Sequence, residues 1–346
     1  MTRAAQRELE MGQKISQRMG NPEVYFPFVA LLVLMILPFT IPVFFVHILI
    51  MIFLFAIIGS AWNLIGGYGG QLSLGHAAFF GIGAYASTML LRSYGLTPWV
   101  GMFIGGLLAL VMGVLLGVIC FRLRGPYFAI ATIGLAEVLR LLALHFRTWT
   151  NGAIGLTIPF KGNAPLLYQF SSKIPYYFIS LIFLILTLLV IRRVEDSRLG
   201  NYLLAIGQDQ DAAEAIGIDS AKAKRMAYYL SAFITAVAGT FYAQYVYFIE
   251  PESVFGLGLS IQIALVAILG GVGKVWGPVV GAVLIESLTQ FTQYAFAGTI
   301  YGLEQIVYGS LLVVIILVRP LGLIQWVQTL YHRWLNLLPG KYASGS

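Results

Sequence analysis

The chain has 346 residues, of which 59% are hydrophobic and only 10% are charged. That balance excludes a soluble globular protein and predicts an all-α polytopic membrane protein. The formal net charge of +7 is explained better by Lys and Arg gathered in loops, where they act as topology signals, than by nucleic-acid binding.

About ten segments are apolar over roughly the 20 residues that a helix needs to cross a bilayer. In chain order they cover residues 24–41, 43–65, 72–91, 98–121, 127–146, 176–191, 226–248, 257–272, 275–297 and 301–318. They predict a transmembrane domain over residues 24–320, with tails at residues 1–23 and 321–346. The first tail is too charged for a signal peptide.

The distribution of basic residues predicts how these spans are oriented. If the N-terminus is cytoplasmic and the spans alternate, 16 of the 21 Lys and Arg residues fall on the cytoplasmic side. This bias follows the positive-inside rule. We therefore expect both termini to be cytoplasmic, because an odd number of spans would place the basic C-terminal tail outside.

The third span opens with a glycine-rich stretch, Gly66-Gly-Tyr-Gly-Gly-Gln-Leu-Ser-Leu-Gly-His76, which we call the first glycine seam. Backbone exposed by such glycines is tolerated in a bilayer only where protein buries it or where it lines a wet cavity. We expect Gln71, Ser73 and His76 to lie on a transport path, where Ser73 and free backbone groups could hold a charged group. Close packing of small residues is the alternative, with His76 packed against its neighbours.

The fifth span contains two ionisable residues, Glu137 and Arg140, three positions apart. That spacing places them on one face of a helix, where they can pair. Ionisable groups within spans are costly and are candidates for function. We expect either a buried pair that fixes helix packing or a place for Glu137 on the transport path. As a packing pair, Glu137→Ala would harm folding by leaving Arg140 without its partner.

A polar loop at residues 192–225 interrupts the apolar spans, with basic residues at both of its ends. Such a loop belongs in the cytoplasm. Its segment 200–218 is amphipathic and helix-prone, and Gly217 offers the positive φ that ends a helix. We expect Leu203, Leu204, Ile206, Ile216 and Ile218 to face a groove, while Asp209, Asp211 and Glu214 face water.

The segment 200–218 has two interpretations. One is a helix that docks into the groove of a partner protein. The other is an amphipathic helix lying on the membrane. The acidic residues argue against the second, because the cytoplasmic leaflet is itself negatively charged.

A second glycine-rich stretch, Leu269-Gly-Gly-Val-Gly-Lys-Val-Trp-Gly-Pro278, joins the eighth and ninth spans, and we call it the second glycine seam. Glycine-interrupted segments in both halves of a transporter are typical of a site built from broken helices. We therefore place Gly270 and Gly271 on the transport path. In the ninth span, Glu286 starts a polar stripe that continues with Gln290 and Gln293 and that either lines a cavity or marks the outer end of the helix.

The sequence lacks the residue patterns of an enzyme. Gly271-Val-Gly-Lys274 has neither the upstream glycine nor the Ser or Thr of a phosphate-binding loop. The four histidines are too scattered for a metal site, and no nucleophile motif or pair of carboxylates is present. We expect the chain to be no enzyme and to bind no metal or cofactor.

The element around Ala212, Ala213 and Gly217 resembles the coupling-helix loop of ABC importer permeases, with Asp211 where Glu is usual. Three further stretches extend the resemblance to the permease family for branched-chain amino acids, in particular its LivM-type subunit. They are residues 66–85, residues 125–140 with 151–156, and residues 250–278. The four stretches stand in family order and span most of residues 60–320.

The resemblance implies a transport subunit in the bacterial cytoplasmic (inner) membrane. It would pair with a homologous LivH-type permease, two ATP-binding subunits that carry ATP and magnesium, and an extracytoplasmic substrate-binding protein. It also implies that ATPase coupling falls to Asp209, Asp211, Ala212, Ala213, Glu214, Gly217 and Ile218. ATP-driven closure of the ATPases would switch the permease pair between its inward- and outward-facing states.

Relatives with this architecture also carry urea, short amides or other amino acids, so the resemblance leaves those substrates open. An ion-coupled carrier that works alone is a further alternative. It would need a coupling-ion site and repeat symmetry across the whole chain. The loop at 192–225 disfavours it, because a lone carrier has no use for a helix that docks a partner.

Overall fold

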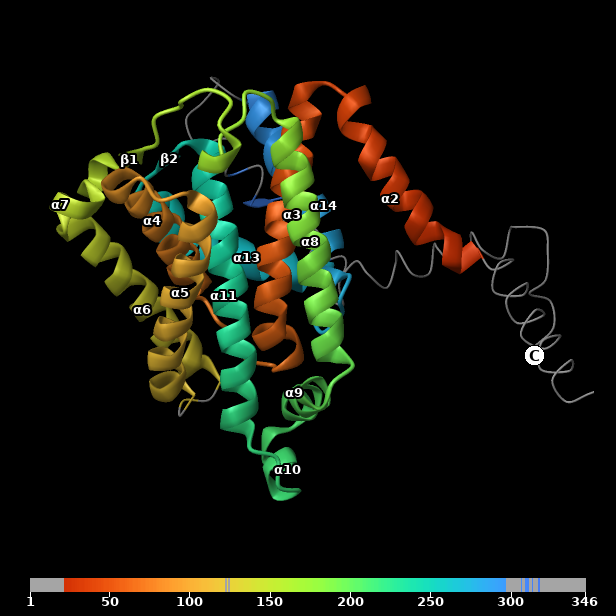
Figure 1. Ribbon diagram of the computed structural model, residues 1–346. Coiled ribbons are helices and arrows are strands. Elements are labelled where there is room, and N and C mark those ends of the chain that lie inside the picture. The colour runs from red at the N-terminus through yellow and green to blue at the C-terminus, as the bar shows by residue number, and fades with distance from the viewer. Residues whose placement is uncertain are drawn as a thin grey trace, which may run out of the picture. The chain divides into compact units, whose positions relative to one another are not determined.

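The computed structural model describes residues 22–121, 123, 125–296 and the positions 306, 309, 310, 313 and 317. These residues are almost entirely helical, with one small two-stranded sheet (Figure 1). Residues 1–47 and 48–346 form two compact units. Helix α2 (Pro22–Thr40) belongs to the first unit and ends just before Pro42. Helix α3 (Val43–Asn63) begins directly after Pro42 and continues into the second unit.

The elements that follow alternate between long helices and short connecting turns. They are the π-helix η1 (Leu64–Tyr68), α4 (His76–Tyr94), α5 (Pro98–Cys120), α6 (Pro126–His145), α7 (Arg147–Thr150), η2 (Gly152–Ile154), β1 (Leu156–Thr157), η3 (Pro165–Leu167), α8 (Ile174–Glu195), α9 (Arg198–Gln208), α10 (Gln210–Ala215), α11 (Ser220–Val246), β2 (Phe248–Ile249), α12 (Pro251–Phe255), α13 (Leu257–Gly270) and α14 (Gly277–Phe296).

Within the described part of the chain, six helical segments are long and apolar enough to cross a membrane. They are Val43–Tyr68, Pro98–Cys120, Pro126–His145, Ile174–Glu195, Ser220–Val246 and Pro251–Gly270. Helices α2, α4 and α14 also lie where spans are predicted but are not among the six. The predicted tenth span lies outside the described residues except for five helical positions, so the count of ten stays a prediction.

Helix α4 packs closely between α5 and α11 because small residues line its contacts. A Cβ on Gly83 would overlap the carbonyl oxygen of Ala236 in α11, and one on Gly239 would overlap that of Phe80. A Cβ on Gly105 of α5 would lie 3.1 Å from the Cα of Gly83. Small residues allow helix backbones to approach one another in membranes. Because α4 is enclosed by α5 and α11, its own residues can be small rather than strongly apolar.

The two ends of α11 carry different structures. Helices α9 and α10 lie at its first residues, whereas β1 and β2 lie at its other end (Figure 1). The two strands are antiparallel, with Leu156 opposite Ile249. After β2 the chain re-enters a helical path that is broken at Gly256, between α12 and α13.

Several boundaries differ from those predicted, among them the start of α11, which is Ser220 rather than residue 226. Helix α4 begins at His76 rather than at residue 72, because the chain from Gly69 to Gly75 forms a loop. The predicted helix at 200–218 is two helices, because Asp209 adopts an extended conformation between α9 and α10. The predicted tails at 1–23 and 321–346 lie almost wholly outside the described residues.

Candidate functional site

The segment formed by α9 and α10 is held in shape by its own capping residues. The Asp209 backbone is extended, which ends α9. Its side chain caps α10, because its Oδ1 accepts a hydrogen bond from the Ala212 amide at 3.0 Å. An aspartate at this position satisfies an amide that a helix start leaves free. The segment is therefore two short helices joined by a bend at Asp209.

Helix α10 ends as predicted, at Gly217. The φ of this residue is +92°, a conformation that favours glycine. The Gly217 amide donates to the Glu214 carbonyl at 3.0 Å, and the Ile218 amide donates to the Ala213 carbonyl at 3.1 Å. This pair of bonds is the Schellman motif that terminates helices at a positive-φ residue.

The apolar residues of the segment divide into two groups. Leu203, Ile206 and Ala213 are buried against the rest of the chain. Ile216 is 78% exposed and Leu204 is 39% exposed, so the single apolar face predicted for the segment is wrong. Asp209, Asp211, Ala212 and Glu214 are exposed, which leaves α10 as a projecting turn with acidic and small side chains.

The α9–α10 segment is attached to the first glycine seam through backbone contacts. A Cβ on Gly207 of α9 would lie 2.7 Å from the Tyr68 carbonyl oxygen, and one on Gly70 would lie 2.9 Å from the Gly207 Cα. Gly70 has a φ of +62°. Beside this contact, the Tyr68 hydroxyl donates to Glu195 Oε1 at the end of α8, over 3.1 Å. A displacement of α9 would therefore act directly on the seam.

Gln71, Ser73 and His76 of the first glycine seam are all buried within the chain. His76 Nδ1 lies 3.0 Å from Ser73 Oγ, and its Nε2 lies 2.8 Å from Ser231 Oγ of α11. Ser231 in turn donates to the Ala61 carbonyl of α3. In this state His76 joins α3, α4 and α11, so its place on a transport path stays a prediction.

Asn63, at the end of α3, joins the two glycine seams. Its Nδ2 donates to the Lys274 carbonyl at 3.0 Å, and its Oδ1 accepts from the Gly273 amide at 3.0 Å. A Cβ on Gly67 would lie 2.6 Å from that same amide nitrogen. The two seams are more than 200 residues apart in the sequence, and they contact each other here.

The second glycine seam brings α13 and α14 together. Gly271 has a φ of +127°, and a Cβ on Gly270 would overlap the carbonyl oxygen of Gly277. Between the same helices, Gln262 Nε2 donates to Glu286 Oε1 at 2.8 Å, and Glu286 is buried. The stripe predicted from Glu286 therefore begins at a helix contact.

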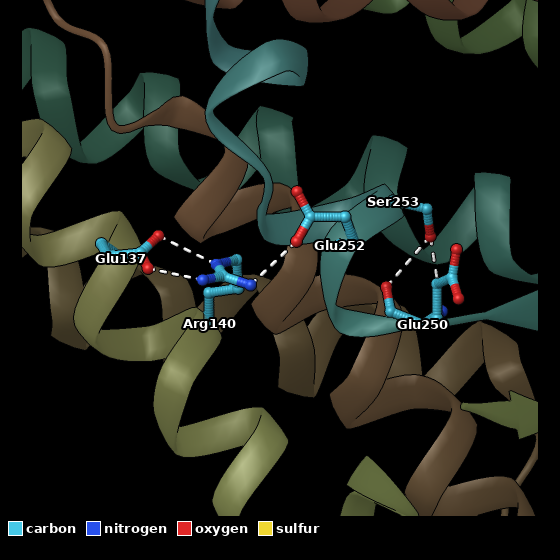
Figure 2. Close-up of polar contacts among 5 residues, drawn as sticks. All are labelled: Glu137, Arg140, Glu250, Glu252 and Ser253. Atoms are coloured by element: carbon cyan, nitrogen blue, oxygen red, sulfur yellow. Dashed lines mark hydrogen bonds and ion pairs between the residues drawn. The ribbon is translucent and has the colours of Figure 1, made fainter. Parts of the chain in front are cut away.

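The predicted pair of Glu137 and Arg140 is confirmed, and it has a third member (Figure 2). Arg140 Nε donates to Glu137 Oε2 at 2.9 Å and its Nη2 to Glu137 Oε1 at 2.6 Å. Its Nη1 donates to Glu252 Oε2 of α12 at 2.8 Å. The Glu137 side chain is 45% exposed, so the expectation of a buried pair is wrong for this carboxylate.

Several residues of these contacts were not singled out from the sequence, among them Asn63, Gly207, Glu252 and Gln262. Asn63 stands alone in an apolar run, and a polar residue there is a signal that could have been weighed. Glu252 belongs to a stretch noted only for its resemblance to a family. No pattern in the sequence indicates that Gly207 meets Gly70, because that contact depends on how α9 folds back.

Comparison with known proteins agrees with this architecture. The family described as "Branched-chain amino acid transport system / permease component" matches residues 44–318. The chain is 31% identical over 323 residues to the high-affinity branched-chain amino acid transport system permease protein LivM of Escherichia coli (strain K12), which covers 86% of this chain and 74% of the relative.

Two other relatives come from Salmonella typhimurium. Its LivM permease protein is 30% identical over 305 residues, which is 81% of this chain and 69% of the relative. Its LivH permease protein is 24% identical over 288 residues, which is 78% of this chain and 91% of the relative. No solved structure matches the chain. The chain belongs to the family of permease components of branched-chain amino acid transport systems.

Proposed function

We propose that this chain is the LivM-type membrane subunit of an ATP-driven importer for branched-chain amino acids. It works by alternating access together with a LivH-type permease, two ATPases and an extracytoplasmic binding protein. The observation that carries the mechanism is the backbone contact of Gly207 with Tyr68 and Gly70. The names of the LivM and LivH relatives support the substrate and the permease pair.

The coupling begins at α10, which projects from the chain. Its exposed residues Asp211, Ala212 and Glu214, followed by Ile216 at 78% exposure, form a compact knob that suits a groove on an ATPase. Because α10 follows α9 directly at Asp209, a push on this knob is passed on to α9. ATPase closure is thereby converted into a movement of α9.

The second step passes from α9 into the membrane domain. Gly207 bears on the first glycine seam, and Asn63 connects that seam with the second one. Both seams contain positive-φ glycines, which can change backbone conformation at low cost. The two states of the permease must bind the ATPases and the substrate differently, since otherwise no coupling arises.

The same proposal includes the topology. The chain crosses the bacterial inner membrane ten times, with both termini and the loop 192–225 in the cytoplasm. It hydrolyses no ATP itself, because that reaction and the bound magnesium belong to the partner ATPases. The basic residues on both sides of α9 and α10 support the placement of this loop.

The test is uptake of labelled leucine into proteoliposomes that hold the complete complex, with the binding protein added outside. We expect ATP-dependent uptake that isoleucine and valine compete and that is lost when the ATPases are omitted. ATPase-dependent uptake of urea or an amide in place of leucine would refute the substrate. Uptake by this chain alone, driven by an ion gradient, would refute the mechanism.

A further inference from the structure

Three charged side chains meet between the last part of α6 and the first turn of α12, in two of the segments that are apolar enough to cross a membrane. Arg140 lies five residues before the end of α6, which places it roughly 8 Å inside that end of the helix. The side chains are partly open: Arg140 is 21% exposed, Glu137 is 45% exposed and Glu252 is 71% exposed. Exposed charges on a membrane helix face water or protein rather than lipid. This cluster therefore faces water or a protein surface rather than lipid.

The two contacts of Arg140 are unequal. Glu137 binds it through two hydrogen bonds from the same helix, which fixes the guanidinium group in place. Glu252 binds it through one hydrogen bond from another helix and is the most exposed of the three. A competing carboxylate can therefore replace Glu252 on Nη1 without disturbing the pair on α6.

A largely apolar pocket of about 600 Å³ begins about one helical turn from this cluster along α6 and α12. Its walls include Tyr85 and Met89 of α4, Leu108 of α5 and Trp149 of α7. Ala143 and Phe255 also line it. Ala143 follows Arg140 by three residues and Phe255 follows Glu252 by three residues, which is about one helical turn in each case. The volume is in the range of pockets that hold small molecules, roughly 300–1,000 Å³.

Tyr85 supplies a second polar group at this pocket. Its ring stacks on Phe255, with ring centroids 5.6 Å apart. Its side chain is 5% exposed, and within the described part of the chain its hydroxyl has no hydrogen-bond partner. A buried hydroxyl without a partner costs free energy, and a ligand that bonded to it would recover that cost.

We propose that Arg140, Glu137 and Glu252, together with the pocket of Tyr85, Met89 and Leu108, form a binding site for a zwitterionic α-amino acid with an apolar side chain. The ligand carboxylate takes the place of Glu252 on Arg140 Nη1. The ligand ammonium group pairs with the released Glu252 carboxylate, and the apolar side chain enters the pocket. One charged cluster thereby recognises both ends of the zwitterion.

This proposal rests on the proposed function, since it places the imported substrate on this subunit. The experiment uses the complete complex in proteoliposomes and measures the KM and maximal rate of leucine uptake for the wild type and for Glu252→Gln. We expect Glu252→Gln to raise the KM at least tenfold, because the amide cannot pair with the ammonium group. Glu252→Asp, which keeps the charge, should restore most of the affinity.

A matched pair of variants tests the pocket. Leu108→Trp fills the pocket and should shift preference from leucine toward alanine at least fivefold. Leu107→Trp puts the same side chain on the preceding residue of α5, which is also exposed but does not line the pocket. This variant should leave selectivity unchanged. A role in helix packing alone would not alter selectivity.

The outcomes separate this site from the proposed function. If the wild-type complex takes up no amino acid, the proposed function fails. If it takes up leucine but Glu252→Gln and Leu108→Trp keep the wild-type KM and selectivity, the proposed site fails. Loss of the partner permease from purified Glu252→Gln complex, with leucine affinity unchanged, would also refute the site and would identify the cluster as a subunit contact.

Discussion

The contacts near the two ends of α11 are of contrasting kinds. At the first end, α9 meets the first glycine seam through backbone atoms, at positions where even a methyl group would clash. At the other end, α6 meets α12 through the side chains of Arg140 and Glu252. The contacts between the glycine backbones leave no room for a side chain, whereas an exposed ion pair contributes little to stability and can be replaced. The first arrangement suits the transmission of a movement and the second suits a replaceable contact.

The largest effect is expected at the backbone contact. Gly207→Val should abolish ATP-dependent uptake, because its Cβ would lie 2.7 Å from the Tyr68 carbonyl oxygen and force α9 away from the seam. Gly134→Ala in α6 is the control, since nothing lies within 4 Å of its added Cβ. Uptake is measured in proteoliposomes. Wild-type uptake by Gly207→Val would show that α9 transmits nothing through this contact.

The next effect concerns stability. His76→Ala should lower the free energy of unfolding by about 2–4 kcal/mol, because it leaves a cavity and removes the partner that Ser73 and Ser231 share. Thermal unfolding of the detergent-solubilised complex checks this. If His76→Ala kept the wild-type melting temperature and lost only transport, His76 would act on the path rather than in the packing.

A smaller effect on stability, with a specific effect on function, is expected at the end of α10. Gly217→Val has room for its side chain, but the φ of +92° strains it by about 1–3 kcal/mol. We expect the ATPases to keep hydrolysing ATP while uptake falls, because the knob on α10 is displaced. Gly217→Asn, which tolerates positive φ better, should retain more coupling. Equal ratios of uptake to hydrolysis in all three proteins would contradict the role of this turn.

The smallest effect is expected in the ion cluster. Glu137→Ala should lower the stability only slightly, because Arg140 keeps its contact with Glu252. The double variant Glu137→Ala/Glu252→Ala should cost clearly more than the sum of the single variants, because it leaves Arg140 with neither carboxylate. Melting temperatures of the four proteins give this comparison. Strict additivity would mean that Glu252 does not compensate for the loss of Glu137.

The sequence by itself determined the class of the protein and the positions of most helices. Apolar runs of fixed length and the glycines between them are local properties, so they predicted nine of the helices to within a few residues. Local spacing also predicted the contact of Glu137 with Arg140 and the helix end at Gly217, because both depend on residues that lie close together in one helix.

Only the tertiary structure decided which distant residues meet. Asn63 contacts Gly273 and Glu252 contacts Arg140 across separations of 210 and 112 residues, and hydropathy carries no information about such pairs. The sequence did not show the break at Asp209 either, since aspartate occurs both on polar helix surfaces and at helix caps. These contacts arise from how the helices fold back on one another, and they define both the coupling contact and the proposed amino-acid site.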